Sequence, residues 1–519
     1  MRRTPFSRSV GNRFSCGVVV VLFALHAGAS AGFADATLEI RVTDGREKLL
    51  PCRIHLADAA GEPVRAKGLP FWRDHFVCTG NVSLPLSAGE YTVTIERGHE
   101  YQRVSRALTL GKSEHKTFTT VLERIAEFAS KGWYSGDLHV HRPVEEVPLL
   151  MQAEDLHVAP VITWWNNRNR WAGESLPQKT LNRFDGNRYF DVMAGEDERE
   201  GGALMYFHLK RPLAIDKSQR EYPSPMRFVA QAREFPQTWI DIEKPFWWDV
   251  PIWLASGEID SIGIANNHMC RSRMYEDEAW GKPRDAKRLP APRGNGFWTQ
   301  EIYYDLLNSG LRVPPSAGSA SGVLPNPVGY NRVYVHTGKN LDYDAWWAGL
   351  RAGRSFVTNG PLLLTVADGQ RPGHIFSSPD GRPITISIQA TVVSNDSIPQ
   401  LEIIKNGATA HAVDVAGRTF EGDAGRVTFN ESGWFLVRAI TDEPRTFRFA
   451  STAPYYVEIG DDARRVSERS VRFFLNWSHE RKKRVPRLLK DAGQLAEVLV
   501  EHDHAIAFWS EQLEKANAP

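Results

Sequence analysis

Apolar and polar residues alternate with a period of two in two separate parts of the chain. In residues 37–124 the alternating runs are "TLEIRVTD", "CRIHLAD", "NVSLPL" and "YTVTIER", separated by Gly, Asp and Pro turns. In residues 366–460 they are "ITISIQA", "LEIIKNG", "RVTFNES" and "GWFLVRAI", with Asn406 and Gly407 suited to a tight hairpin turn. Such alternation is typical of half-buried strands. The pattern predicts a small β-sandwich in each part.

The segment between them, residues 125–365, has a different pattern. Short apolar runs such as "VAPVITWW", "YFDVMAGE", "IDSIGIANNH" and "RVYVHTG" alternate with helix-like stretches such as "EEVPLLMQAEDL", "PMRFVAQAREF" and "AWWAGLRAG". Alternating strands and helices indicate βα units around a parallel sheet or barrel. The predicted fold class is therefore α/β, with a central βα unit between two sandwiches.

The last stretch, residues 461–519, has apolar residues at helical spacing and a break near Pro486, which predicts a tail of two helices. A chain of 519 residues is too long for one core, so several globular units are expected.

The N-terminal segment, residues 1–36, has the features of a secretory signal. A basic region precedes the apolar run "CGVVVVLFALHAGA", and small residues end at Ala31 or Ala36. The run is shorter than the roughly 20 residues that a membrane-spanning helix needs. We expect a secreted or periplasmic protein with no stable membrane anchor after cleavage; an uncleaved anchor is the alternative.

Composition narrows the partners. The formal net charge of +1 gives no electrostatic case for nucleic acid or an anionic membrane. A small molecule or glycan is the expected partner, and the argument for it must come from a site. In an oxidising compartment Cys52 and Cys78 could pair, although the sequence does not show whether their geometry allows it.

Polar residues at the ends of the central strand-like runs are the candidate site. His139 and His141 are two residues apart, so on a strand they point to the same side and could bind one metal ion. The alternative is a pair of half-exposed strand histidines. Ligands bind at the carboxyl ends of strands in barrels and doubly wound sheets. Other polar residues at such ends are Asn166, Glu196, Asn267 and His268.

Four stretches in order resemble one known family. "GDLHVHRP" resembles the opening motif of the polymerase-and-histidinol-phosphatase (PHP) superfamily of metal-dependent hydrolases, in particular its secreted, carbaryl-hydrolase-like branch. "DVMAGEDERE", "IDSIGIANNH" and "AWWAGLRAGRSFVTNGPLL" resemble later motifs of that branch, and the resemblance runs from Trp133 to Leu364. It implies a distorted seven-strand barrel that activates water with zinc, manganese or iron to cleave an ester, amide, carbamate or phosphoester bond.

The sequence also departs from the family pattern. A strand end that carries a carboxylate and an imidazole in the family reads "TWWN" here, and a late Ser-Asp-x-His motif reads "SASG". A Gly-His motif is also absent, with His208 as a substitute. The resemblance leaves four ligands for one divalent ion, zinc first: His139, His141, Glu196 and His268.

Roles follow for the remaining candidates. The resemblance assigns catalytic roles to Glu196, to Asp137 as a residue that orients a ligand, and to Lys244 as a cation near the site. Twelve of the 16 tryptophans lie in the central segment, and indole faces suit a sugar ring or an aromatic group. The expected substrate-binding residues are Trp164, Trp165, Asn166 and Asn267.

Three functions compete. The first is a secreted metal-dependent hydrolase acting on a carbohydrate-like or aromatic substrate. The second is a catalytically degenerate barrel that binds a carbohydrate or aromatic ligand through its tryptophans, which the missing ligands favour. The third, an extracellular scaffold, leaves the polar strand ends unexplained.

Overall fold

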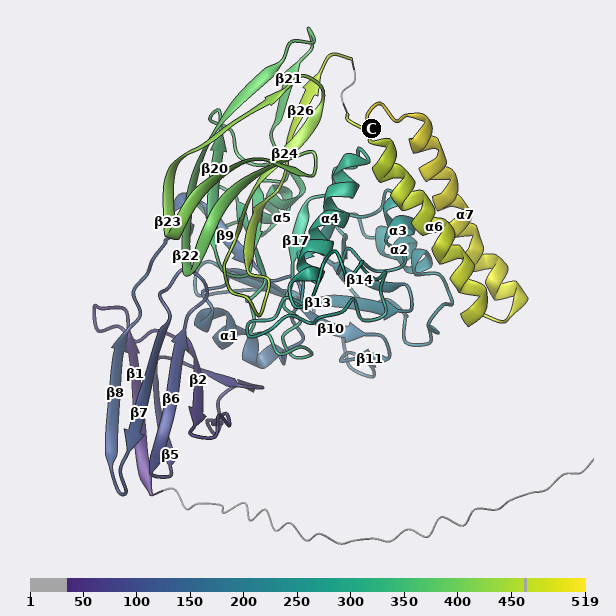
Figure 1. Ribbon diagram of the computed structural model, residues 1–519. Coiled ribbons are helices and arrows are strands. Elements are labelled where there is room, and N and C mark those ends of the chain that lie inside the picture. The colour runs from purple at the N-terminus through teal and green to yellow at the C-terminus, as the bar shows by residue number, and fades with distance from the viewer. Residues whose placement is uncertain (1–34, 462–463) are drawn as a thin grey trace, which may run out of the picture.

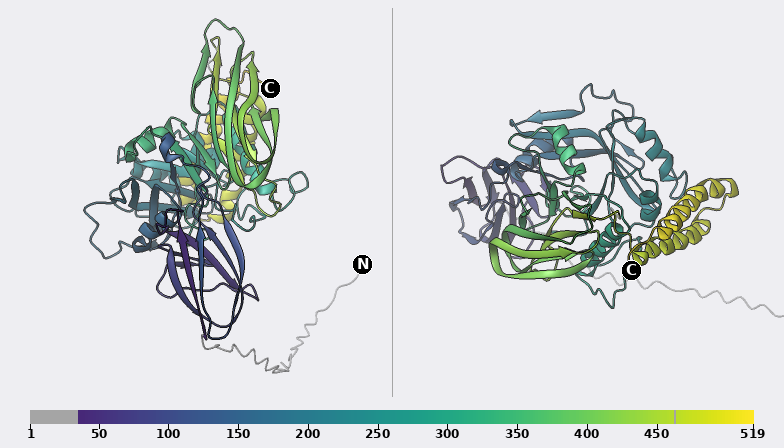
Figure 2. Two further views of the ribbon diagram at one scale, coloured as in Figure 1. Left: turned by 90° about the vertical axis from the view of Figure 1, so that its left-hand side faces the viewer. Right: turned by 90° about the horizontal axis from the view of Figure 1, so that it is seen from above.

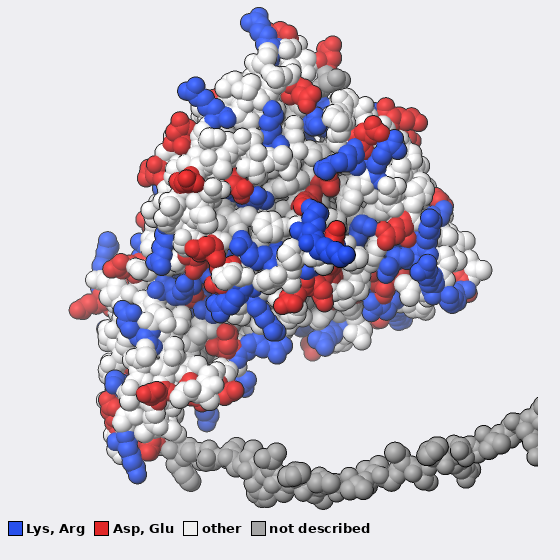
Figure 3. All heavy atoms as spheres, viewed as in Figure 1, with Lys and Arg blue, Asp and Glu red and all other residues white. Residues whose placement is uncertain are grey.

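The computed structural model describes residues 35–461 and 464–519, and the expected signal segment lies almost wholly outside them. The chain is mixed α/β (Figure 1). Its N-terminal strands and its late strands lie at opposite ends of a central region, and a pair of long helices packs on one side (Figures 1 and 2). On the face in Figure 3, Lys and Arg are interspersed with Asp and Glu, in keeping with the small net charge.

Two sheets form the N-terminal region. The three-stranded sheet has the order β5-β1-β8, and the five-stranded sheet has the order β3-β4-β2-β6-β7. Alternate residues of β1, such as Leu38, Ile40 and Val42, are fully buried between the sheets, as the alternation predicts. The strands are β1 (Ala36–Thr43), β2 (Cys52–Asp58), β3 (Phe71–Trp72), β4 (His75–Cys78), β5 (Asn81–Leu86), β6 (Gly89–Glu96), β7 (Val104–Leu110) and β8 (His115–Val121).

The central region contains short helices and a sheet of mixed direction. Its elements are η1 (Ala129–Lys131), β9 (Trp133–Gly136), η2 (Val144–Glu146), α1 (Val147–Ala153), β10 (Val158–Trp165), β11 (Arg168–Asn169), β12 (Leu181–Phe184), β13 (Arg188–Arg199), β14 (Gly202–Phe207), α2 (Pro225–Arg233), β15 (Trp239–Ile242), α3 (Val250–Ala255), β16 (Ser261–Ala265), α4 (Gly294–Asn308), β17 (Pro315–Ala317), β18 (Arg332–His336), α5 (Tyr343–Arg351) and β19 (Ser355–Thr358).

The pairing in this sheet is only partly that of βα units. Parallel pairs join β9 to β10, β10 to β13, β15 to β16 and β16 to β17. However, β13, β14 and β15 are antiparallel neighbours, and β18 returns to pair antiparallel with β9. The expected regular alternation is therefore interrupted by a hairpin after β13, and β13 is the strand that carries Glu196.

The late strands continue the central sheet instead of forming a separate unit. β19 pairs with β25, and Trp133, Tyr334 and Phe356 of the central region share a core with the late strands. The expected boundary at residue 365 falls inside β20. Asn406 and Gly407 form the expected turn, both with positive φ. The strands are β20 (Leu362–Ala367), β21 (Ile375–Ser378), β22 (Ile384–Lys405), β23 (Ala408–Phe429), β24 (Gly433–Ile440), β25 (Phe449–Thr452) and β26 (Tyr455–Ile459).

Two helices close the chain, α6 (Glu468–Leu488) and α7 (Ala492–Glu514). The break between them follows Leu488, so Pro486 lies inside α6, in its last turn, where a proline disrupts little of the helix. Asp491 caps α7 by accepting a hydrogen bond from the backbone N–H of Gln494 at 2.8 Å. Among the helices described, none is both long enough and apolar enough to cross a membrane.

Cys52 and Cys78 lie directly opposite each other on β2 and β4, and both are buried. Their Sγ atoms are 3.9 Å apart, whereas a disulfide requires about 2.05 Å. The two thiols are thus neighbours without a bond, and the bridge stays a prediction.

Buried His157 gives the fold a pH-dependent stability. Burial lowers the pKa of His157 to about 3, and its Nδ1 accepts a hydrogen bond from the Ser135 hydroxyl at 3.2 Å. Below pH 6.5 the unfolded chain takes up a proton here that the folded chain does not, so the free energy of unfolding falls as the pH falls towards 3. We expect about 1.4 kcal/mol per pH unit from this residue. Urea denaturation at pH 7, 6 and 5 should show a shallower slope for His157→Gln than for the wild type. Exposed His115→Gln is the control, and equal slopes for all three proteins would contradict the assignment.

Candidate metal-binding site

Two histidines and one glutamate converge beside the carboxyl end of β9. His139 and His141 follow that strand, and their Nε2 atoms lie 2.9 Å apart. Glu196, on β13, places its Oε2 3.4 Å from His139 Nε2 and 3.2 Å from His141 Nε2. The three ligand atoms all lie within 4.8 Å of one another. The structure thus brings together three of the four metal ligands that the resemblance implied.

The chemistry of this group fits a divalent ion. Two Nε2 atoms that face each other cannot both donate a hydrogen bond to the other, and the buried Oε2 of Glu196 has no hydrogen-bond partner. Burial alone would raise the pKa of Glu196, but the two imidazoles offset it and lower that pKa. Two imidazole nitrogens and a carboxylate oxygen are ligands that zinc and similar ions use.

His268 does not join this group. Its ring packs between Phe246 and Tyr275, with centroids 5.5 and 5.3 Å away, and its Nδ1 donates to the backbone carbonyl of Asp277 at 3.2 Å. The side chain is therefore held by a different set of contacts. The group in the described part of the chain has three ligands instead of the expected four. His208, the other substitute considered, donates to the carbonyl of Gln237 and is not in the group either.

Asp137 fixes the backbone of the site. Its Oδ1 accepts from the backbone N–H groups of His139 and Ser319, and its Oδ2 accepts from that of Gly329 at 2.6 Å. It thereby ties the histidine segment to the loop after β17. Asp137 contacts neither imidazole ring, so it is a positioning residue and the expected catalytic role is corrected.

The loop after β17 approaches the histidines closely. A Cβ at Gly318 would lie 2.4 Å from the Cβ of His139. At Gly322, where φ is +102°, a Cβ would lie 2.6 Å from the carbonyl oxygen of His141. Glycine is therefore required at both positions, because any side chain would displace a residue of the ligand group.

Glu243 is the residue that the sequence analysis missed. It directly follows β15, and its Oε1 lies 3.4 Å from His139 Nδ1. It also accepts hydrogen bonds from Asn267 Nδ2 and Trp247 Nε1 and pairs with Lys244 Nζ. A carboxylate at Nδ1 fixes the tautomer that leaves Nε2 available to an ion. Its position after a buried strand was the available signal.

Lys244 and Asn267 thus act through Glu243. The Lys244 ammonium lies 2.5 Å from a carboxylate oxygen of Glu243 and 4.6 Å from the Trp247 ring centroid. Asn267 donates to the same carboxylate, and its buried Oδ1 has no hydrogen-bond partner. The expected catalytic and substrate-binding roles of these two residues become the support of a ligand's partner.

The two adjacent tryptophans point in different directions, as neighbours on a strand do. Trp164 is buried, donates from Nε1 to the carbonyl of Met193 at 3.2 Å and packs on Gly195, so it belongs to the core and not to a binding wall. Trp165 is half-buried, with its ring centroid 5.0 Å from that of His141. Trp165 is therefore the aromatic side chain beside the ligand group.

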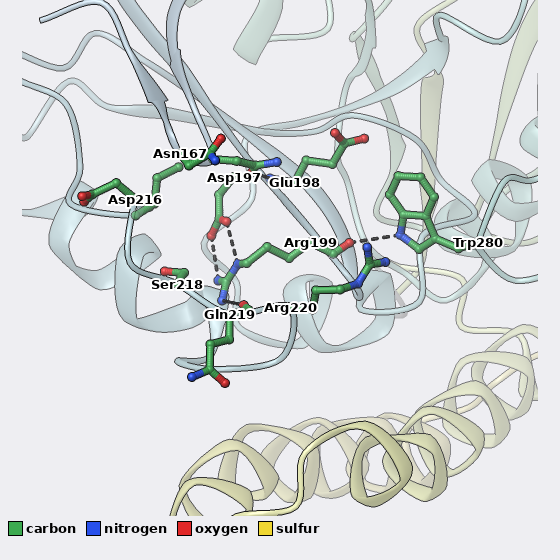
Figure 4. A pocket seen from close by; sticks show the side chains of 11 residues that line it. Asn167, Asp197, Glu198, Arg199, Asp216, Ser218, Gln219, Arg220 and Trp280 are labelled. Atoms are coloured by element: carbon green, nitrogen blue, oxygen red, sulfur yellow. Dashed lines mark hydrogen bonds and ion pairs between the residues drawn. The ribbon is translucent and has the colours of Figure 1, made fainter. Parts of the chain in front are cut away.

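A polar pocket of about 440 Å³ lies next to this group (Figure 4). Asn166, in the left-handed region with φ of 50°, lines it and accepts a hydrogen bond from the backbone N–H of Glu198. The Asp197–Arg199 ion pair forms one wall, and Trp280 donates to the carbonyl of Arg199 at 3.0 Å (Figure 4).

Glu198 joins the pocket to the ligand group. It lies two residues after Glu196 on β13, so both side chains are on the same face of the strand. Its half-buried carboxyl group lines the pocket and points away from the Asp197–Arg199 pair (Figure 4). Burial and the nearby Glu196 raise the pKa of Glu198 to about 8. The sequence analysis did not single out this residue.

Comparisons with known proteins do not identify a family. No protein-family model and no curated protein match the chain. Three solved structures resemble parts of it. They are the minor pilin GBS52 of Streptococcus agalactiae (20% identity, TM-score 0.15, 18% of this chain and 45% of the pilin), the TIE protein of Bacillus anthracis (14%, 0.14, 21% and 19%) and the fibronectin(III)-like modules of CbhA from Clostridium thermocellum (20%, 0.12, 18% and 94%). At these TM-scores the similarities carry no argument about the site.

Proposed function

We propose that the protein is a metal-dependent hydrolase in which His139, His141 and Glu196 hold one divalent ion, with zinc the best match and manganese or iron as alternatives. The observation that carries the proposal is the convergence of two imidazole Nε2 atoms on a buried carboxylate oxygen that lacks a hydrogen-bond partner. The return of β18 to β9 is consistent with the barrel that the family resemblance implies.

The chain's own residues divide the work. A bound ion of this kind lowers the pKa of a water molecule and polarises the oxygen of the bond under attack. Glu243 holds the ring of His139 from behind, and Asp137 holds its backbone. Glu198, on the same face of β13 as Glu196, transfers a proton to or from the substrate in the pocket. Trp165 and Trp280 supply faces for a carbohydrate-like or aromatic group.

The substrate bond is an ester, amide, carbamate or phosphoester. The test is equilibrium dialysis of the purified mature protein against zinc, followed by elemental analysis and a screen of these four bond classes. Zinc retained at His139, His141 and Glu196 together with zinc-dependent turnover supports the proposal. Failure of this group to retain any zinc, manganese or iron contradicts it. We also propose that the protein is secreted or periplasmic, on the strength of residues 1–36.

A catalytically degenerate ligand-binding protein is the second candidate. The observations that favour it are the three-membered ligand group and the replacement of family ligands by Trp164 and Trp165. This candidate predicts that a sugar or aromatic ligand quenches tryptophan fluorescence with saturation while none of the four bond classes is cleaved.

The contact between Glu243 and His139 gives a separate prediction. We expect Glu243→Gln combined with Lys244→Gln to lower zinc affinity about 10- to 100-fold, because the imidazole loses its charged partner. Changing both residues avoids leaving a buried ammonium unpaired. Competition with a coloured zinc chelator measures the change. The control is Glu258→Gln, a carboxylate paired with Arg233 elsewhere, and wild-type affinity in the double variant would contradict the role of Glu243.

A further inference from the structure

A second group of metal-ligand side chains lies in the N-terminal region, between β2 and β4. His55 is on β2, His75 begins β4, and Asp74 precedes His75 in the turn after β3. The antiparallel register pairs Cys52 with Cys78 and Ile54 with Phe76, which brings His55 opposite His75. The centroids of the two rings are 5.1 Å apart.

The ligand atoms converge on one point. His55 Nδ1 lies 3.2 Å from Asp74 Oδ2, and His75 Nδ1 lies 2.9 Å from Asp74 Oδ1. One atom from each residue belongs to a set that lies within 4.8 Å of one another. Both imidazoles therefore present the same nitrogen to the same carboxylate, and an ion at this point would be held by all three side chains.

The surroundings suit a zinc-type ion with one open position. Glu96 Oε2 lies 3.4 Å from His55 Nε2, where a carboxylate supports an imidazole that binds metal through its other nitrogen. Arg53 Nε also lies 3.0 Å from this Nε2. His75 is 2% exposed, whereas the Asp74 side chain is 49% exposed, so an ion can enter from solvent and keep a water ligand.

The β3–β4 hairpin also contacts the first ligand group. Trp72 Nε1 donates to the backbone carbonyl of Leu324 at 2.7 Å, in the loop after β17. Arg142, which follows His141, donates to the carbonyl of Phe71 and lies 5.5 Å from the centroid of the Trp72 ring. The hairpin therefore rests on the segments that shape the surroundings of His141.

We propose that His55, Asp74 and His75 bind a second divalent ion of the zinc class, which fastens the β3–β4 hairpin to β2 and supports the segment around His141. The site is separate from the first ligand group and stands without the hydrolase proposal. The competing explanation is a hydrogen-bonded cluster in which Asp74 accepts a proton from each ring.

Zinc stoichiometry of the full chain tests the proposal. After dialysis against zinc at pH 7.5, we expect His55→Gln/Asp74→Asn to hold one zinc fewer than the wild type. His139→Ala/His141→Ala should retain the equivalent that the first variant lacks. The matched control is His115→Gln/Glu39→Gln, which changes another histidine and carboxylate pair of the same region, 4.0 Å apart. Circular dichroism checks that each variant is folded.

Hydrogen exchange of residues 71–78 gives a second measurement. Zinc should slow exchange there at least severalfold in the wild type and in His139→Ala/His141→Ala, and leave it unchanged in His55→Gln/Asp74→Asn. Equal zinc content in His55→Gln/Asp74→Asn and the wild type overturns the second site and leaves the hydrolase proposal intact. Loss of zinc only in that variant supports the second site and contradicts the first.

Discussion

Replacing His139 and His141 together with alanine is expected to remove the zinc bound at the first ligand group and, with it, zinc-dependent hydrolysis. The two rings supply two of the three ligand atoms, and Glu196 alone cannot hold an ion against water. Losing several kcal/mol of transition-state stabilisation corresponds to a fall in kcat/KM of about 10³-fold or more. Elemental analysis measures the metal, and turnover of the best substrate from the screen measures the activity.

The control for this variant is His115→Ala combined with His411→Ala, which removes two exposed imidazoles from other strands. It should keep both the metal and the activity. Chelation of the wild-type protein should reproduce the loss, and added zinc should reverse it there but not in the His139→Ala/His141→Ala variant. Full zinc content and full activity in that variant would show that the three side chains form a hydrogen-bonded cluster without a metal.

Strand patterns were predictable where each strand has one buried face. In β1 the buried Leu38, Ile40 and Val42 alternate with more exposed residues, so the sequence carries the period directly. The boundary at residue 365 was not predictable, because β19 pairs with β25 across it and Phe356 shares a core with the late strands. Long-range pairing of this kind leaves no local signal in the sequence.

The ligand group was predictable in part for the same reason. His139 and His141 are close in sequence, and their shared side follows from strand geometry; Glu196 was reached through the motif in which it lies. His268 occupies a similar strand end, but its ring turns towards Phe246 and Tyr275, which a pattern of polar residues cannot reveal. Trp164 and Trp165 could not be distinguished until the direction of β10 was known.

The two carboxylates that were missed show what the sequence conceals. Glu198 lies in "GEDERE", a run that is also typical of a solvated loop, and only the length of β13 shows that it shares a face with Glu196. Glu243 lies beside Lys244, and a neighbouring ion pair gave no indication that its carboxylate reaches His139. Both depend on the register between strands that are distant in the sequence.

Glu198→Gln should reduce kcat about 10²- to 10⁴-fold while the zinc content stays that of the wild type, because the change removes proton transfer and keeps the ligand group. Glutamine preserves the shape of the side chain in the pocket wall, so KM should change little. The matched control is Glu200→Gln, two residues further along, whose carboxylate pairs with Arg220 at 2.6 Å. Steady-state kinetics with metal analysis of the same samples separates the two roles. A fall in zinc content that parallels the fall in kcat would make Glu198 a metal ligand, and wild-type kcat would leave the proton to another group. Because Glu196 and Glu198 lie on one face of β13, comparing their variants distinguishes the carboxylate that holds the ion from the one that moves the proton.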